Sequence, residues 1–364
     1  MKDNTRKTGL STGTIATASS IAAIKVLLGN EPNVKVTDVI SPEGIISSVQ
    51  IKESLKLNEI TAQASAIKFD YNDPDITVNH EIISKVKLFD KNSDIPLNKE
   101  LHSEDIIIVG GDGVGIITKH GLQLPIGSYA INPIPRSMII KNLKKYLPKN
   151  KRALVTITIP EGEELAKKTM NPRLGIIRGL SILGTTGIAI SRSNEAYKKS
   201  LVYQLSIAMA YKYEELIFVP GNIGEKYALK HFNVNKDQII QMGNYVGFML
   251  KKAKEYGINK IILLGHIGKL IKIAGGIFNT QNKIADTRRE IMSAHTALCG
   301  ADTETVEKIF NSTTTEEMLA ILRKKDMDKA VLKNINKSIV DICKERFNID
   351  IELILIDMKG NKLN

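Results

Sequence analysis

A histidine and a lysine stand at a glycine-marked junction in the second half of the sequence, where a predicted strand gives way to a predicted helix. Residues 261–264 have the length and β-branched content of a buried parallel strand, and Gly265 ends the apolar run. His266, Gly268 and Lys269 come next. An imidazole titrates near neutral pH, so His266 is a candidate catalytic base, and it can equally hydrogen-bond a carboxylate or cap its helix. Lys269 is a candidate binder of an anionic substrate.

Two earlier stretches have the same order of strand, glycine-containing turn and helix. Residues 216–219 precede a helix predicted at 225–231, and residues 238–241 precede a helix predicted to end near residue 256. Three such units in succession predict a parallel sheet. Ligands of open α/β sheets bind beyond the carboxyl ends of the strands, so the loops of these units predict a binding site.

Carboxylates follow a strong strand pattern in the first half of the chain. Residues 154–159 form the strand pattern, and Glu161 and Glu163 then lie at the start of a predicted helix. A helix dipole favours acidic residues in the first turn, which explains both residues without a ligand. They remain candidates for binding a cationic ligand such as a sulfonium.

A second charged group lies near the start of a later predicted helix. Asp286, Arg288 and Glu290 are closely spaced there, and His295 follows a little over a turn later. Surface ion pairs between residues three or four positions apart would account for this pattern. Asp286 is also a candidate catalytic group, and Arg288 and Glu290 are candidate ligand-binding groups.

Small hydroxyl residues and glycines mark two turns. Thr12 and Thr14 are candidate N-caps of a helix that keeps its apolar spacing to residue 26. Gly184, Thr185 and Thr186 offer backbone and hydroxyl donors in a row, which suits capture of a carboxylate or phosphate. Both turns are therefore candidate binding sites, and a capped packing helix is the alternative for the first.

A glycine-rich loop at residues 110–115 looks like a dinucleotide-binding turn. The fingerprint requires a helix after the loop, whereas residues 116–121 have the pattern of a strand and a turn. A Rossmann-type site is therefore not predicted. Further on, a proline-rich run reaches Arg136 and precedes a helix predicted at 137–146, which indicates a rigid wall beside that arginine.

The composition is that of a folded protein with a strong positive charge. The chain has 364 residues, 43% hydrophobic and 25% charged, with a formal net charge of +12. This charge suits an anionic partner, although lysine-rich surface alone would also explain it. Aromatic residues make up only 5% and the lysines are scattered, which argues against a nucleic-acid-binding surface.

The cysteines and the first residues bear on the expected compartment. Cys299 and Cys343 form no CxxC pair or disulfide framework, so a reducing cytoplasm is expected. Residues 1–29 lack a continuous apolar core, and neither a signal peptide nor a membrane helix is predicted.

Two aspartates near Pro74 suit a turn better than a metal site. No partner on a membrane is expected, and a homo-oligomer is left open.

These patterns predict a two-domain protein of the α+β and α/β classes. The first domain, at residues 1–190, is α+β with glycine- and proline-rich loops. The second, at residues 191–364, is α/β, with a small parallel sheet built from three βα units.

Several stretches, read in order along the chain, resemble the cobalt-precorrin-5B C(1)-methyltransferase family (CbiD) of the anaerobic cobalamin pathway. They are residues 11–14, 73–77, 113–136, 159–187 (IPEGEELAKKTMNPRLGIIRGLSILGTTG) and 265–274 (GHIGKLIKIA), with a looser match at 285–290. The sequence departs from the family pattern at Ile15, Tyr71, Asn72, Gln281 and Thr287. Ile15 stands where the family often has cysteine, which excludes a cysteine nucleophile at that position.

The resemblance implies transfer of a methyl group from S-adenosylmethionine to C-1 of cobalt-precorrin-5B, giving cobalt-precorrin-6A. The substrate is a large ring with many carboxylates and carries the cobalt itself, so no protein metal site is expected. His266 and Asp286 are then the expected catalytic residues, and Glu161, Glu163 and Asp286 are the candidates for holding the cationic methyl donor. The expected ligand-binding residues are Thr12, Thr14, Arg136, Glu161, Glu163, Arg173, Gly184, Thr185, Thr186, Lys269, Arg288 and Glu290.

Two other functions are compatible with parts of the sequence. A kinase-like enzyme could use the GHIGK and GTTG turns for phosphate, but the P-loop pattern is missing and GHIGK is too short for that cradle. A basic nucleic-acid-binding module is the second alternative, and its affinity would fall steeply with salt.

Overall fold

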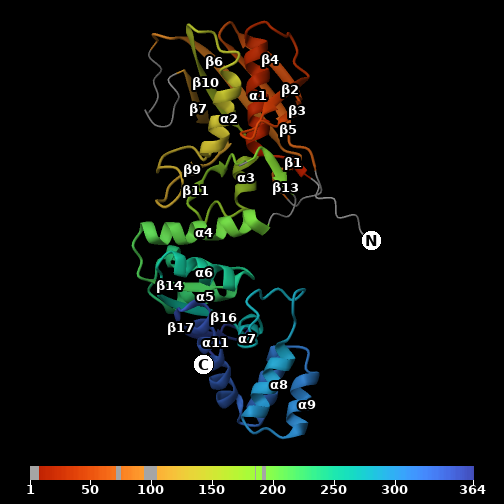
Figure 1. Ribbon diagram of the computed structural model, residues 1–364, viewed down its shortest axis with the longest axis vertical. Coiled ribbons are helices and arrows are strands. Elements are labelled where there is room, and N and C mark those ends of the chain that lie inside the picture. Colours follow the sequence, from red (N-terminus) through yellow and green to blue (C-terminus); the bar gives the residue numbers. More distant parts are fainter. Residues whose placement is uncertain (1–7, 71–74, 94–104, 185, 191–193) are drawn as a thin grey trace. The chain divides into compact units, whose positions relative to one another are not determined.

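The computed structural model describes residues 8–70, 75–93, 105–184, 186–190 and 194–364. The chain divides into two compact units, Met1–Asn194 and Glu195–Asn364. Both units contain strands and helices, and Figure 1 labels these elements. The domain boundary predicted at residue 190 stays a prediction.

A mixed five-stranded sheet forms the centre of the first unit. Its order is β4 (Glu53–Asn58), β5 (Thr61–Ile67), β6 (Glu81–Asp90), β10 (Lys151–Thr158) and β7 (Ile106–Gly110). Neighbouring strands are antiparallel except β10 and β7, which run parallel. Helices α1 (Thr12–Leu27) and α2 (Pro133–Leu143) pack against each other, and α1 packs on β5 and β6 (Figure 1). The predicted α+β architecture of this part of the chain is confirmed.

The register between β6 and β10 sets where their ends meet. Thr158 at the end of β10 is opposite Ile83 near the start of β6. The parallel partner β7 ends at the same edge, because Ile157 of β10 is opposite Gly110. The turn that follows β10, the loop that follows β7 and the residues before β6 therefore lie at one edge of the sheet.

Short strand pairs and one short helix complete the described part of the first unit. They are β1 (Thr8–Leu10) with β13 (Ile188–Ile190), β2 (Val36–Ile40) with β3 (Ile46–Gln50), β8 (Gly113–Val114) with β12 (Gly179–Leu180), and β9 (Ile116–Ile117) with β11 (Ile176–Ile177), together with α3 (Gly162–Ala166). The strand at 116–117 confirms that no helix follows the glycine-rich loop. This loop is thus not a Rossmann turn.

A parallel four-stranded sheet forms the centre of the second unit. Its order is β15 (Ile239–Gln241), β14 (Glu215–Val219), β16 (Lys260–His266) and β17 (Asp350–Ile356), and every neighbouring pair is parallel. The helices that follow its first three strands in the chain are α5 (Asn222–His231), α6 (Val246–Glu255) and α7 (Ile267–Ala274). The predicted parallel sheet is confirmed, and β17 adds a strand that its sequence pattern did not assign to the sheet.

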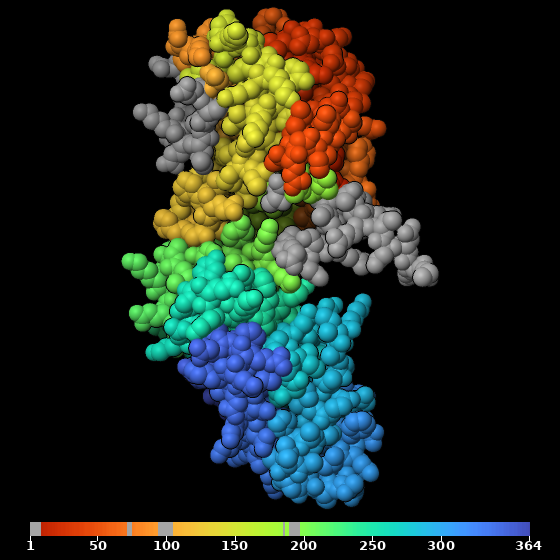
Figure 2. Space-filling view, viewed as in Figure 1, coloured from red at the N-terminus to blue at the C-terminus, as the bar shows by residue number. Residues whose placement is uncertain are grey.

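The remaining helices of this unit are α4 (Asn194–Ala210), α8 (Arg288–Leu298), α9 (Thr303–Asn311), α10 (Thr315–Lys324) and α11 (Asp328–Phe347). Helix α11 packs on β17 of the sheet and on helices α7 and α8 (Figure 1). It therefore connects the sheet with helix α8. In the space-filling view the chain around α8 and α9, in light blue, forms one lobe of the surface (Figure 2).

Several predicted boundaries were wrong. The N-cap of α1 is Ser11, whose hydroxyl accepts a hydrogen bond from the Thr14 amide, so neither Thr12 nor Thr14 is the cap. Helix α2 begins at Pro133 instead of residue 137, because proline suits the first turn, where its missing N–H has no partner to lose. Strand β4 was not predicted, since it is largely exposed and lacks a regular alternation.

The described helices include none that is long and apolar enough to cross a membrane.

Candidate functional site

The carboxyl edge of the parallel sheet gathers polar side chains from successive strands. Asn244 follows β15, and its side-chain oxygen accepts a hydrogen bond from the Lys269 ammonium at 3.1 Å. Lys269 lies in the first turn of α7, is half-buried, and has its pKa lowered by burial. An ammonium held at a helix N-terminus beyond the strand ends can bind an anion. This is the position that the sequence predicted for Lys269.

His266 uses both ring nitrogens within the protein. Its Nδ1 accepts a hydrogen bond from the Gly268 amide at 3.1 Å and caps α7. Its Nε2 therefore carries the hydrogen and donates to the Glu316 carboxylate at 2.6 Å. Burial acts to raise the pKa of Glu316, but the bond from His266 and other hydrogen bonds lower it. This arrangement favours the helix cap over the catalytic base, because no lone pair of the ring is left for a proton.

Asp286 and Arg288 form a two-bond ion pair. Arg288 donates through Nε to one carboxylate oxygen at 2.6 Å and through a terminal nitrogen to the other at 2.8 Å. The hydrogen bond from Arg288 lowers the pKa of Asp286, and the same bond raises the pKa of Arg288. Each residue thus compensates the charge of the other, which leaves Asp286 a weak candidate for holding a cation.

Lys272 explains how the loop before α8 is held. Its side chain is fully buried, and its ammonium donates to the carbonyls of Thr280 and Ala285 and to the side chain of Asn282. Burial lowers its pKa. Sequence reasoning missed this residue, because a lysine on an amphipathic helix is normally at the surface.

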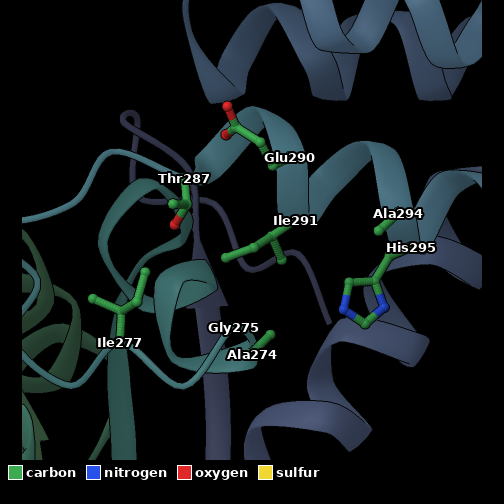
Figure 3. A pocket seen from close by; sticks show the side chains of 8 residues that line it. All are labelled: Ala274, Gly275, Ile277, Thr287, Glu290, Ile291, Ala294 and His295. Carbon is green, nitrogen blue, oxygen red and sulfur yellow. The ribbon is translucent and has the colours of Figure 1, made fainter.

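A cavity of about 370 Å³ lies between the end of α7 and helix α8. Its apolar lining includes Ala274, Ile277 and Ile291, while Thr287 and Glu290 lie toward one end and His295 toward the other (Figure 3). The Thr287 hydroxyl oxygen is buried and has no hydrogen-bond partner among the described residues. Glu290 thus adjoins an apolar cavity.

The edge of the mixed sheet in the first unit brings Glu161 to His80. Glu161 lies in the turn after β10, and His80 immediately precedes β6. The carboxylate of Glu161 is 2.8 Å from Nδ1 of His80. Glu163, in α3, is exposed in the first turn of a helix, as predicted. No sequence pattern selects His80, because it is a single histidine far from Glu161 in the chain.

The predicted hydroxyl turns do come together, as a structural joint. Thr12 donates to the Leu183 carbonyl and accepts from the Leu183 amide, and Thr14 donates to the Gly187 carbonyl at 2.6 Å. Both threonines are buried. Among the described residues, the hydrogen bonds of the Thr186 hydroxyl are within its own turn, to Ile188. Thr185 lies outside the described residues.

Gly184 fits closely against the start of α1. It has φ +152°, and a Cβ there would lie 2.4 Å from the Ser11 hydroxyl. The backbone of this turn therefore serves to pack against the helix, and the predicted role of Gly184 in binding stays a prediction.

Arg136 departs from its predicted role. It is 6% exposed, and its guanidinium donates to the backbone carbonyls of Ile131, Ile108 and Tyr129. These bonds fix the loops around β7 and α2, and they leave the side chain buried. The structure therefore favours a structural role over binding of a substrate carboxylate. Arg173 is half-buried, and its carbonyl accepts a bond from Lys119, so its predicted role as a binder stays open to test.

A predicted turn around Pro74 falls partly outside the described residues. Next to it, the buried Lys68 forms an ion pair with Asp75 and a hydrogen bond of 2.9 Å with Thr77. No group of three His, Cys, Asp or Glu side chains that could hold a metal ion occurs in the part of the chain that the structure describes.

Comparisons with known proteins agree across the chain. A family model described as CbiD matches residues 1–191, and a second, described as the CbiD C-terminal domain, matches residues 279–364. A cobalt-precorrin-5B C(1)-methyltransferase of Methanobrevibacter smithii is 52% identical over 361 residues, covering 99% of this chain and 97% of that protein. The proteins of the same name from Methanosphaera stadtmanae and Methanocaldococcus jannaschii are each 45% identical, over 100% and 98% of this chain and 92% and 95% of those proteins.

A solved structure is also similar. It is titled as a cobalamin biosynthesis protein (cbiD) from Archaeoglobus fulgidus, with 24% identity, a TM-score of 0.38, and coverage of 79% of this chain and 86% of that one. Because two family models and full-length relatives match it, the chain belongs to the CbiD family.

Proposed function

We propose that this protein is a cobalt-precorrin-5B C(1)-methyltransferase that acts in cobalamin biosynthesis. The observation that carries the proposal is the similarity to proteins of that name, at 52% identity over nearly the full length of both chains. The positive net charge of +12 supports it, because the substrate is a ring with many carboxylates.

We infer that the methyl donor is S-adenosylmethionine and that the product is cobalt-precorrin-6A. Methyl transfer from a sulfonium is an in-line displacement, in which the protein contributes mainly by holding two reactants in position. The half-buried Lys269 beside Asn244 stays a predicted binder of substrate carboxylates in the second unit, and Arg173 stays one in the first.

The cavity beside Glu290 has the chemistry that a sulfonium donor needs. Its apolar lining suits the uncharged part of the donor, and a carboxylate at one end suits the positive charge. Glu290 is a better candidate than Asp286, since Arg288 already neutralises Asp286.

Replacing Glu290 by Gln is expected to weaken binding of S-adenosylmethionine by up to about fivefold, the range for one exposed charge pair. Isothermal titration calorimetry measures this effect. Glu307→Gln removes another exposed carboxylate, on α9, and should leave the affinity unchanged. Equal affinity of the Glu290 variant and the wild type would move the donor away from this cavity.

The function itself is tested with cobalt-precorrin-5B and S-adenosylmethionine labelled in its methyl group. We expect label in the corrinoid, at C-1 by NMR, and release of S-adenosylhomocysteine. A folded protein that transfers no label to the corrinoid would refute the proposal.

Neither alternative function gains support. The Gly268 amide of the GHIGK turn is already bonded to His266, which removes one donor that a phosphate cradle would need. A nucleic-acid-binding module would bind DNA with an affinity that falls steeply with salt. We expect this protein to show no such affinity for DNA.

A further inference from the structure

The described structure places one histidine in the arrangement that proton transfer requires, and the sequence patterns did not select it. His80 lies just before β6, and Glu161 lies in the turn after β10. Thr158 of β10 pairs with Ile83 of β6 at the end of their ladder, three residues away from Glu161 and His80 respectively. The adjoining strand ends and the turn after β10 therefore bring these two side chains together.

The two ring nitrogens of His80 have different surroundings. Nδ1 is 2.8 Å from the Glu161 carboxylate. An ionised carboxylate can only accept, so this contact assigns the hydrogen to Nδ1 and the lone pair to Nε2. Within the described part of the chain no hydrogen bond to Nε2 is found, and the imidazole side chain is 29% exposed. The imidazole is thus partly accessible from solvent, while its Nδ1 is engaged with Glu161.

We propose that His80, oriented by Glu161, accepts the proton that the corrinoid ring loses when C-1 is methylated. This inference rests on the proposed function and adds a residue to it. It also supplies the base that His266 does not, since His266 has both ring nitrogens engaged within the protein.

The chemistry needs such an acceptor. A sulfonium donor transfers its methyl group as a cation: the carbon–sulfur bond breaks, its electron pair stays on sulfur, and a new carbon–carbon bond forms at C-1. The ring π system thereby gains one positive charge. Loss of one ring proton to Nε2 of His80 returns an electron pair to the ring and leaves an imidazolium, which the Glu161 carboxylate stabilises before water takes the proton.

The backbone holds this pair rigidly on the Glu161 side. Gly162, next to Glu161, packs against Gly113 so closely that an added Cβ would lie 2.1 Å from the Gly113 carbonyl oxygen. The amide of Gly162 also donates to the Ile159 carbonyl, which closes the turn. This turn therefore holds in place the carboxylate that orients His80.

The other charged groups around the pair stay charged near neutral pH. Lys52 forms an ion pair of 2.8 Å with Glu81 and has its pKa raised by that hydrogen bond. Burial acts to raise the pKa of Glu81, but the bonds to it lower its pKa. In the loop before His80, Lys68 outweighs the effect of burial and lowers the pKa of Asp75. These shifts move the pKa values of Lys52, Glu81 and Asp75 away from neutral pH.

Replacing His80 by Gln tests the proposal in single-turnover methylation of cobalt-precorrin-5B. We expect the rate to fall about 100-fold or more, with the affinity for the corrinoid little changed. The decline of the wild-type rate toward acid pH should disappear from the profile of the variant. Glu161→Gln should lower the rate less and keep that decline. Glu164→Gln, which removes a surface carboxylate of α3 paired with Lys167, should match the wild type.

A smaller variant separates a chemical role from a structural one. His80→Gly should be as slow as His80→Gln, and added imidazole should restore part of its rate in proportion to the concentration of the unprotonated form. Thermal unfolding checks that both variants are folded.

The results distinguish this inference from the proposed function. A wild-type protein that transfers no methyl group refutes both. An active wild type with a full-rate His80→Gln variant refutes the role of His80 alone. A slow variant whose pH profile is unchanged and which imidazole does not rescue also refutes it, because that is the result for a purely structural residue.

Discussion

Two histidines of this protein differ in what their ring nitrogens contact. In His266, Nδ1 accepts a hydrogen bond from the Gly268 amide and Nε2 donates one to the Glu316 carboxylate. In His80 the carboxylate of Glu161 takes one, and the other has no hydrogen bond within the described residues. The residue type made either a candidate base, and only the contacts separate a helix cap from a proton acceptor.

His266→Ala is expected to lower the free energy of unfolding by about 1 kcal/mol, because α7 loses its N-cap hydrogen bond. His266→Asn should lose less, since asparagine is a good N-cap. Urea unfolding measures both variants. The cap assignment fails if the Ala variant is as stable as the wild type.

The pair of His266 and Glu316 makes the free energy of unfolding depend on pH. Glu316 has a lowered pKa in the folded protein. The pair therefore stabilises the fold at pH values above the ordinary Glu range, and stabilises it less as the pH falls through the lowered pKa.

Two arginines also have partners within the protein: Arg136 donates to backbone carbonyls, and Arg288 pairs with Asp286. Charge in the sequence is not charge available to a ligand.

At the scale of elements, Gly113, Gly162 and Gly179 permit a close backbone crossing in the first unit. A Cβ on Gly113 would lie 1.8 Å from the Ile159 carbonyl oxygen, and one on Gly179 would lie 2.2 Å from the Gly113 backbone. Strand β8, strand β12 and helix α3 meet at this point. The glycine-rich loop that resembles a nucleotide-binding turn is therefore required for packing.

Gly162→Ala is expected to lower the free energy of unfolding by about 3 kcal/mol, because its methyl group would overlap the Gly113 backbone. Gly221→Ala is the matched control, since a Cβ there meets nothing within 4 Å and its φ of 170° is ordinary extended backbone. The control should stay within about 0.5 kcal/mol of the wild type. Equal stability of the two variants would contradict the crossing.

A helix cap in the lobe of α8 and α9 provides a second pH-dependent element. The Asp302 side chain caps α9 by accepting from the Thr305 amide at 2.7 Å. Hydrogen bonds from Thr305 lower the pKa of Asp302 to about 2. A lowered carboxylate pKa stabilises the fold above the ordinary Asp range of about 4, and this contribution is lost as the pH falls to about 2.

Asp302→Asn keeps an N-cap acceptor and removes the titration. We expect the wild type to exceed the variant in stability at neutral pH and the difference to vanish near pH 2. Urea unfolding over this pH range measures it. A difference that is constant with pH would show that the charge of Asp302 makes no contribution.

At the scale of the whole molecule, the net charge of +12 should act on a substrate with many carboxylates. We expect the KM for cobalt-precorrin-5B to rise with salt while kcat changes little, because screening weakens attraction more than chemistry. Steady-state kinetics over a series of sodium chloride concentrations tests this. A KM that is independent of salt would mean that the charge serves solubility alone.

Much of the fold could be predicted from the sequence because its signals are local. The strands at 216–219 and 261–264, and the glycine turns after them, fixed the parallel sheet of the second unit. The edge strand β4 and the place of β17 in the sheet escaped prediction. An exposed strand has no clear alternation, and the pairing of β17 with β16 joins residues far apart in the chain.

The sequence by itself determined the family, through long motifs in a fixed order, and the two classes of sheet, through hydrophobic periodicity. Only the tertiary structure decided which polar side chains are occupied and which are available. The physical reason is that a hydrogen bond depends on distances of a few tenths of an ångström. The adjoining ends of β6 and β10 and the turn after β10 set such a distance between His80 and Glu161, and no local pattern in either segment records it.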